Sequence, residues 1–354
     1  MDFLIAREDL HRCELRESAE PQPGPGQALL AVERFGLTSN NVTYAAFGEA
    51  MSYWDFFPAE PGWGRMPVWG FARVLDSQVK GLTAGQRVYG YLPPSSWLVV
   101  SPERVGEIGF IDASPHRAQL PAAYNSYAAT DADPVYDAAT ENQQMLLRPL
   151  FFTSWLIDDF LSESDCFGAE TVVLSSASSK TASALAFLRA RSDGPRIVGL
   201  TGSRSVEFAS GLGVYDAVLG YDELDTLPGE TAVYVDMAGD ARVRQQVHEH
   251  FGAKLAHSAV VGATHLDAMG AVPEALPGPR PTFFFAPDRV AKRSADWGRA
   301  GLEQRLAEAW SPYVQWTGGW LQIVEGELGE DLRSAYLELL DGRIDPATAH
   351  VFAV

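Results

Sequence analysis

The chain has 354 residues, of which 46% are hydrophobic and 21% charged, a composition typical of a soluble globular protein with one large domain or two. A net charge of −19 argues against binding to nucleic acid or an anionic membrane, because both require clustered Lys and Arg. The two cysteines, Cys13 and Cys166, form neither a metal-binding spacing nor a disulfide framework. No apolar run is long enough to cross a bilayer. We expect a cytoplasmic protein without bound metal.

Short apolar runs between Gly- and Pro-rich turns make the first part of the chain β-rich. We predict strands over 28–36, 72–77 and 86–91, in a small barrel or sandwich. Residues 106–147 are polar and irregular, which indicates a partly helical insertion. An apolar segment over 150–161 predicts a helix that begins the second domain.

The chain is organised around residues 171–201. An apolar run over 171–174 predicts a buried strand, a polar turn follows, and small and apolar residues recur at helical spacing over 181–191. Asp193-Gly194-Pro195 ends that helix, and 197–200 is a second buried strand. A strand, helix and strand in about thirty residues form a βαβ unit, the centre of a dinucleotide-binding fold.

The polar turn differs from a glycine-rich phosphate-binding fingerprint. Its three spaced positions hold Ser176, Ser179 and Ala182, which are small but not glycine. Hydroxyl groups and a positive charge suit phosphate oxygens, and the turn supplies them from Ser178, Ser179, Lys180 and Thr181. The same serines and threonine are also ordinary helix caps. Both interpretations stand at this point.

Strands and helices continue to alternate after residue 201. We predict helices over 204–212, 241–251 and 301–310, and strands over 217–221, 231–236, 255–262 and 282–285. This alternation predicts an α/β fold, a Rossmann doubly wound parallel sheet covered on both faces.

The end of the second strand bears on the choice of cofactor. An NAD enzyme places Asp or Glu there, whereas this chain has Leu200-Thr201-Gly202-Ser203-Arg204. Ser203 and Arg204 suit a 2′-phosphate, so we predict NADPH. The alternative for Arg204 is a solvated residue in the first turn of a helix.

Several stretches, taken in order, resemble the medium-chain dehydrogenase/reductase superfamily over nearly the whole chain. They are 24–38, 67–70, 85–90, 171–191, 211–216, 235–239 and 260–262. The resemblance implies a GroES-like β-rich substrate domain split around a Rossmann domain, with the active site in the cleft between them. The expected domains are 1–147, 148–312 and a return over 313–354.

The resemblance is to the zinc-independent branch, which includes quinone oxidoreductases and enoyl reductases, and within it to a subgroup with a serine-rich phosphate turn. The positions of the zinc ligands in alcohol dehydrogenases fall near Thr38, Phe71 and Ala72, which do not bind metal. The resemblance also places Tyr221 beside the adenosine and Gly262 and Ala263 beside the nicotinamide. A homodimer that pairs residues 282–285 with their twofold mate is a further implication.

Reduction without metal needs a hydrogen-bond donor for the developing oxyanion. The candidate acids are Tyr44 and Tyr53, and Thr38 and Asn41 are candidates for binding a carbonyl. For each the alternative is structural, as a helix cap or a packed tyrosine. His248 and His250 lie two positions apart on a predicted helix and point to different faces, so they do not chelate a metal together. Trp316 and Trp320 are either an aromatic wall for a planar substrate or core residues.

These observations favour an NADPH-dependent, zinc-independent reductase of a small-molecule substrate: an activated carbonyl, a quinone or a conjugated enone. The first alternative is a protein of the same fold that has lost catalysis and senses a nucleotide or binds a partner. The second is an enzyme that uses the nucleotide structurally and performs acid-base chemistry.

Overall fold

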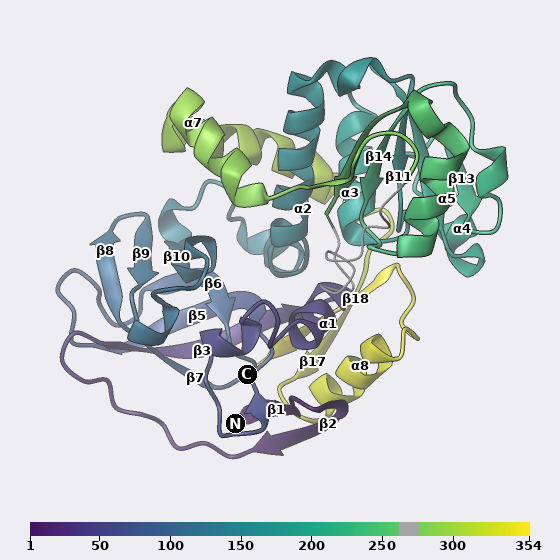
Figure 1. Ribbon diagram of the computed structural model, residues 1–354. Coiled ribbons are helices and arrows are strands. Elements are labelled where there is room, and N and C mark those ends of the chain that lie inside the picture. Colours follow the sequence, from purple (N-terminus) through teal and green to yellow (C-terminus); the bar gives the residue numbers. More distant parts are fainter. Residues whose placement is uncertain (262–275) are drawn as a thin grey trace. The chain divides into compact units, whose positions relative to one another are not determined.

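Residues 1–261 and 276–354 are described by a computed structural model, in which the chain forms two units (Figure 1). One unit consists of Met1–Arg148 and Leu321–Val354, and the other of Pro149–Trp320. The return to the first unit at Leu321 comes after the expected residue 313, because helix α7 (Ala286–Thr317) continues past that position.

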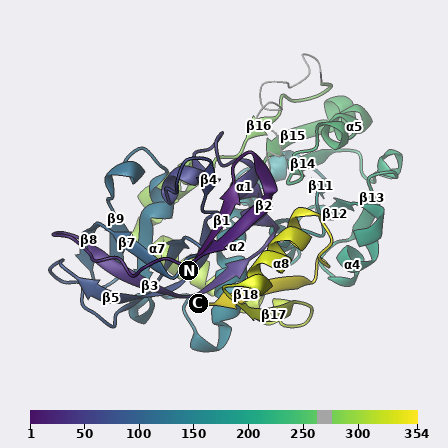
Figure 2. The same ribbon diagram turned by 90° about the horizontal axis from the view of Figure 1, so that it is seen from below.

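The first unit is the β-rich one. Its larger sheet has the strand order β17-β18-β3-β5-β6-β10-β9-β8, with β7 paired to β3, and its smaller sheet has the order β2-β1-β4. Figure 2 shows helix α8 (Glu330–Leu340) alongside β17 and β18. The strands are β1 (Asp2–Ala6), β2 (Asp9–Arg16), β3 (Ala28–Leu37), β4 (Trp63–Gly64), β5 (Val68–Ser77), β6 (Arg87–Leu92), β7 (Trp97–Val100), β8 (Pro102–Gly106), β9 (Gly109–Asp112), β10 (Ser126–Ala129), β17 (Gln322–Glu327) and β18 (Thr348–Ala353).

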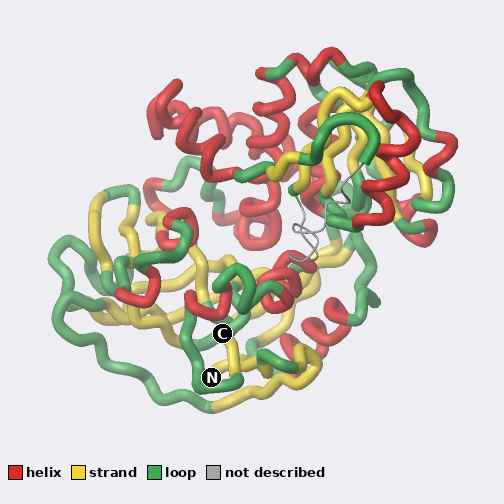
Figure 3. Tube along the Cα trace, viewed as in Figure 1, coloured by secondary structure: helices red, strands yellow, loops and turns green. Residues whose placement is uncertain are grey.

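A parallel sheet forms the centre of the second unit, and its strand order is β13-β12-β11-β14-β15-β16. This is the Rossmann order: β12 and β13 are added on one side of β11, and β14, β15 and β16 are added on the other side. Helices α3 and α4 lie on one face of the sheet, where Phe187 of α3 and Phe208 of α4 contact Trp316 and Trp320 (Figures 1 and 3). Helix α5 packs on the other face, against a hydrophobic cluster that includes Tyr234. The elements are β11 (Thr171–Leu174), α3 (Lys180–Arg189), β12 (Arg196–Thr201), α4 (Val206–Gly211), β13 (Ala217–Gly220), β14 (Ala232–Asp236), α5 (Ala241–Phe251), β15 (Leu255–Val260) and β16 (Thr282–Phe283).

The structure confirms the predicted fold class, since it combines a doubly wound α/β sheet with a separate β-rich region. The sequence pattern explains it: β11 and β14 are fully buried and, apart from Thr171 and Asp236 at their ends, apolar, as expected of strands covered on both faces. Helix α5 begins where Asp240 caps the amides of Arg242 and Val243, at 2.8 and 3.2 Å.

Several predicted elements have different bounds. Helix α2 (Glu141–Glu163) begins well before residue 150, because Leu146 and Leu147 are buried and extend its apolar face. Residues 106–147 contain strands β9 and β10 as well as short helical turns. Residues 39–46 form a helix, α1 (Ser39–Ala46), that was not among the predicted elements. Helix α7 is far longer than the predicted 301–310 and is kinked at Gly298. Among the described residues, no helix is both long and apolar enough to span a membrane.

Candidate functional site

The serine turn joins the end of β11 to the start of α3. Ser179 is the N-cap of α3, and its hydroxyl oxygen accepts a hydrogen bond from the amide of Ala182 at 3.1 Å. The Ser178 hydroxyl lies 3.0 Å from the hydroxyl of Thr201 at the end of β12. The helix-cap interpretation therefore describes Ser179 correctly. A hydroxyl that accepts one hydrogen bond keeps its own proton for donation, so this role is compatible with phosphate binding.

Ser176 occupies the first of the three spaced positions and has a left-handed backbone, with φ of 55°. Left-handed conformations favour glycine, so this serine adopts the backbone shape that a fingerprint glycine provides. Its amide donates to the Tyr221 hydroxyl at 3.0 Å. The structure thus brings Tyr221, predicted beside the adenosine, into contact with the turn.

The N-terminus of α3 is suited to an anion. Lys180 and Thr181 begin the helix, and its first turn contains no acidic residue. The first amides of an α-helix lie outside its own hydrogen-bond ladder, and they carry the positive end of the helix dipole. These features fit a diphosphate at this position.

A close packing contact supports the turn from the sheet side. A Cβ atom at Gly199 of β12 would lie 2.7 Å from the Ala177 Cβ and 3.0 Å from the Tyr215 ring. The Tyr215 hydroxyl donates to the Ala177 carbonyl at 2.8 Å. Because Gly199 has no side chain, the Tyr215 ring packs beside it and the Tyr215 hydroxyl bonds the turn.

A buried pair that sequence reasoning missed lies where β11 and β14 end side by side. The Ser175 hydroxyl donates to Asp236 Oδ1 at 2.9 Å and accepts the amides of Met237 and Ala238 at 2.9 and 3.0 Å. Asp236 Oδ1 also accepts the amide of Gly239 at 2.9 Å. We call Ser175 and Asp236 the switch-point clasp, because they join the two loops that flank the reversal of strand order. A serine directly after one buried strand and an aspartate ending another were the available sequence signal.

Burial dominates the electrostatics of the clasp. Asp236 is fully buried, and burial raises the pKa of its carboxyl group, while Arg244 at 3.6 Å opposes that shift. Asp236 Oδ2 has no hydrogen bond from any described residue.

Ser203 and Arg204 are exposed, in a short 3-10 turn (Ser203–Ser205) directly after β12. No described residue forms an ion pair with Arg204. β12 ends in Thr201, which has no carboxylate to repel a 2′-phosphate, although Asp222 and Glu223 follow the adjacent end of β13. The donors present fit NADPH. The remaining predicted cofactor residues, Gly262 and Ala263, lie outside the described residues.

In the β-rich unit, Thr38 and Asn41 form the capping box of α1. Asn41 Oδ1 accepts the amide of Thr38 at 2.8 Å, and Asn41 Nδ2 donates to the Pro67 carbonyl at 2.9 Å. The Thr38 hydroxyl is 3.3 Å from Asn41 Oδ1. Both side chains are buried and make their hydrogen bonds within the protein, as expected of helix-capping residues rather than carbonyl-binding ones.

Tyr44 and Tyr53 lie in an aromatic cluster with their ring centroids 4.7 Å apart. We call it the tyrosine cluster. Its members come from α1, β5, β6 and the short 3-10 helices η1 (Tyr53–Phe56) and η3 (Ala122–Asn125), and they are Tyr44, Tyr53, Phe56, Trp69, Tyr91 and Tyr124. Trp69 Nε1 donates to the Tyr44 hydroxyl at 3.4 Å. Tyr91 and Trp69 were missed, although strand alternation places Tyr89 and Tyr91 on one face of β6.

Burial raises the pKa of every tyrosine hydroxyl in the cluster, to about 12 for Tyr53 and above its usual range for Tyr44, Tyr91 and Tyr124. Neighbouring phenols add to the shift, because each would repel a second negative charge. These tyrosines therefore stay protonated at neutral pH and act as donors.

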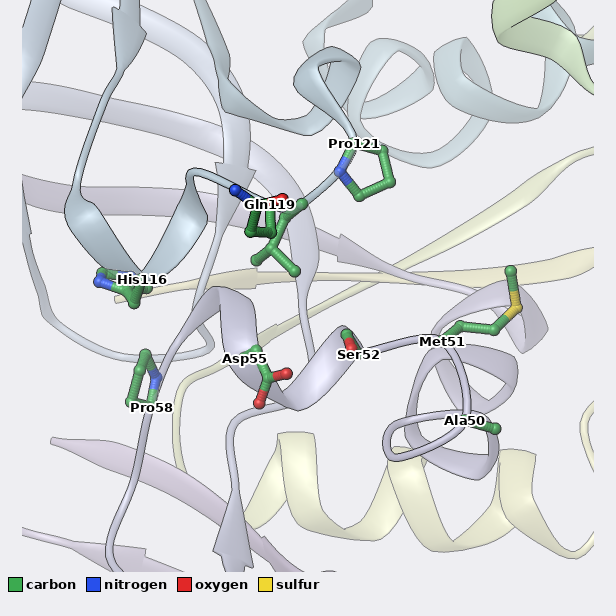
Figure 4. Close-up of a pocket in the computed structure, with 9 residues that line it drawn as sticks. Ala50, Met51, Ser52, Asp55, Pro58, His116, Gln119 and Pro121 are labelled. Atoms are coloured by element: carbon green, nitrogen blue, oxygen red, sulfur yellow. The ribbon is translucent and has the colours of Figure 1, made fainter.

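A pocket of about 530 Å³ is lined in part by Ser52 and Asp55, at the start of η1. Figure 4 shows Ser52 and Asp55 on one wall and His116, Gln119 and Pro121 on the facing segment. His116 Nε2 donates to the Phe56 carbonyl at 3.3 Å, so Nδ1 remains available. With one carboxylate and no Lys or Arg in its lining, the pocket does not suit an anion.

The other residues singled out from the sequence have structural surroundings. His248 Nε2 bonds the Ser258 hydroxyl at 2.9 Å, and His250 Nε2 donates to the Leu227 carbonyl at 3.1 Å, so the two histidines serve different partners. Trp316 packs on Phe187 and Trp320, with ring centroids 5.0 and 5.3 Å away.

A family model described as "Protein of unknown function (DUF2855)" matches residues 35–345, so the chain belongs to that family. Comparison with curated proteins gives no match.

Solved structures share the fold at low sequence identity. Escherichia coli K-12 YhdH with bound NADPH is 16% identical, with 100% of each chain covered and a TM-score of 0.59. CurA from Vibrio vulnificus in complex with NADPH is 14% identical, with 97% of this chain and 94% of that chain covered and a TM-score of 0.56. CurK enoyl reductase is 16% identical, with 99% and 98% covered and a TM-score of 0.58. At these identities the likeness establishes the fold.

Proposed function

We propose that this member of the DUF2855 family is an NADPH-dependent, zinc-independent oxidoreductase that reduces an activated carbonyl, a quinone or a conjugated enone. The observation that carries the proposal is the start of α3, where a serine turn and Lys180 meet a helix end without acidic residues. Two solved proteins of the same fold, YhdH and CurA, hold NADPH, which supports this choice of cofactor.

NADPH supplies a hydride when it is bound. The amides at the start of α3 and the Lys180 ammonium group bind its diphosphate, and Ser203 and Arg204 bind its 2′-phosphate. Tyr44 and Tyr53 belong to the tyrosine cluster, whose hydroxyls burial keeps protonated, and this cluster supplies the hydrogen bond to the substrate oxygen. Thr38, Phe71 and Ala72, at the positions that resemble zinc-ligand positions, offer no thiolate, imidazole or carboxylate.

A titration of the protein with NADPH and NADH, followed by cofactor fluorescence, tests the proposal. We expect saturable binding of NADPH with a micromolar dissociation constant. Arg204→Ala should weaken NADPH binding about 10- to 100-fold, the effect of losing a charge-assisted hydrogen bond, and should leave NADH binding unchanged. Arg196→Ala is the matched control, because Arg196 is an exposed arginine at the opposite end of β12. Without saturable NADPH binding, the reductase assignment should be abandoned.

The bonds that Ser178 and Ser179 make within the protein favour a second candidate, a nucleotide-binding protein that transfers no hydride. Absorbance at 340 nm distinguishes the two when NADPH is incubated with a panel of quinones and enones. Tight binding without oxidation of NADPH would favour nucleotide sensing, or acid-base chemistry beside a structural nucleotide.

A further inference from the structure

The tyrosine cluster has one accessible side. Tyr91 is fully buried, and Tyr44 and Tyr53 are 5% and 9% exposed. Trp69 and Tyr124 are only half-buried, and their ring centroids lie 6.0 Å apart. Any molecule that touches the cluster from solvent therefore meets these two side chains first.

The hydroxyl groups of the cluster are not all paired within the described part of the chain. The Tyr91 hydroxyl makes no hydrogen bond of regular geometry with any described residue, although the Tyr44 and Tyr124 hydroxyls are close enough to shift its pKa. The Tyr44 oxygen already accepts the Trp69 indole N–H. Buried polar groups are rarely left unpaired, so the phenols of this cluster have a hydrogen bond to offer to an acceptor such as a carbonyl oxygen.

The charges beside the cluster are neutralised. Arg117 lies 4.7 Å from the Phe57 ring and pairs with Asp112 at 3.1 Å, and both side chains are 1% exposed. Arg148 lies 4.8 Å from the Tyr89 ring and pairs with Asp133. Because both arginines are paired and ring faces are electron-rich, the cluster gives an anionic substrate no favourable site.

We propose that Trp69 and Tyr124 form the substrate-contacting face of this enzyme and that the substrate is a neutral, planar, conjugated carbonyl compound bearing an aromatic ring. The aromatic ring stacks on Trp69, and the carbonyl oxygen accepts a hydrogen bond from Tyr124. Tyr91 is a positioning residue, since its ring packs on Tyr124 with centroids 4.7 Å apart. The inference rests on the proposed function and narrows its substrate class.

In the overall reaction an enone, NADPH and one proton give a saturated ketone and NADP⁺. The hydride forms a C–H bond at the β-carbon, and the electron pair of the C=C bond moves towards the carbonyl, whose oxygen becomes negative. The Tyr124 hydroxyl stabilises that oxygen, and a proton from solvent completes the product at the α-carbon.

Steady-state kinetics with two neutral enones and one anionic enone test the inference. The substrates are benzylideneacetone, its para-carboxylate derivative and 3-buten-2-one, which has no aromatic ring. We expect the wild-type kcat/KM to be at least tenfold higher for benzylideneacetone than for either of the others. Trp69→Leu should raise KM for benzylideneacetone about tenfold without changing kcat. Trp69→Phe, which keeps an aromatic ring, should raise this KM less. Tyr124→Phe should lower kcat tenfold or more with little change in KM.

Tyr336→Phe is the matched control, because this buried hydroxyl donates to the Leu10 carbonyl at 3.0 Å, outside the cluster. Each variant is also titrated with NADPH, and its dissociation constant should equal that of the wild type. Equal use of 3-buten-2-one and benzylideneacetone, or a Tyr124→Phe variant as active as Tyr336→Phe, overturns the inference and leaves the reductase assignment intact. A wild type that binds no NADPH overturns both.

Discussion

Replacing Ser175 with alanine removes one oxygen atom from the switch-point clasp. That hydroxyl serves three partners: it donates to Asp236 and accepts the amides of Met237 and Ala238. The side chain is fully buried, so water does not replace the lost contacts without rearrangement. The substitution therefore leaves two amides without an acceptor and a carboxylate with one hydrogen bond fewer.

The size of the effect follows from these contacts. A hydrogen bond to a charged group contributes about 1.5–3 kcal/mol, and a buried amide left unpaired costs about 1–3 kcal/mol. The three bonds share one atom and the loop relaxes in part, so their contributions do not add fully, and we expect a loss of about 3 kcal/mol in the free energy of unfolding. For a domain of this size that loss lowers the melting temperature by about 6–12 °C.

Thermal unfolding followed by circular dichroism measures this shift, with Ser183→Ala as the control. Ser183 is also buried in this unit, but its hydroxyl makes a single bond, to the Lys180 carbonyl at 3.2 Å. We expect the control to lose less than about 1.5 kcal/mol. If Ser175→Ala melts at the same temperature as Ser183→Ala, the clasp does not hold the two loops and our reasoning about the switch point is wrong.

Two further predictions concern assembly and acid stability. We propose that the protein is a homodimer through the edge strand β16, beside which Phe283 and Phe285 are 44% and 48% exposed. Light scattering after size exclusion should give a dimer that Phe283→Asp converts to a monomer, and a monomeric wild type would count against it. Lys292 and Arg289 lower the pKa of Glu163 from 4.5 to about 2, so its contribution to stability is complete above pH 4.5 and is lost as the pH falls towards 2. Over that interval the melting temperature of the wild type should fall more steeply than that of Glu163→Gln, whereas parallel curves would contradict the ion pairing.

The Rossmann unit was predictable because its signals are local. The apolar run over 171–174 and the regular spacing after it reproduce β11 and α3 closely, and the helix predicted over 241–251 has the bounds of α5. The start of α2 was wrong because Pro149 resembles a first-turn proline, whereas it lies inside the helix. Packing of Leu146 and Leu147 decides that boundary, and this tertiary contact is not visible in the local pattern.

The site residues show the same difference between local signals and tertiary packing. Ser179 as a cap and Ser176 at a glycine position follow from fixed spacing along one turn. By contrast, the tyrosine cluster brings together α1, η1, β6 and η3, which are far apart in sequence. Tyr44 and Tyr53 were selected as candidate acids, but the contact of Tyr44 with Tyr91 depends on the packing of the sheet. Asn41 was selected as a polar residue near the site, and the fold uses it to close a helix end.

The contact of Tyr215 with Ala177 across Gly199 changes where this chain tolerates substitution. In a glycine-rich phosphate loop the indispensable small residues lie in the loop itself. Here serines occupy the loop, and the position at which a side chain would collide is Gly199 in the neighbouring strand β12. Glycine in place of Ser176 should be accepted, since its backbone already has the required shape. Even an alanine Cβ at 199 would collide with Ala177 and the Tyr215 ring, so an inherited or engineered change in the middle of a strand would disturb the serine turn directly.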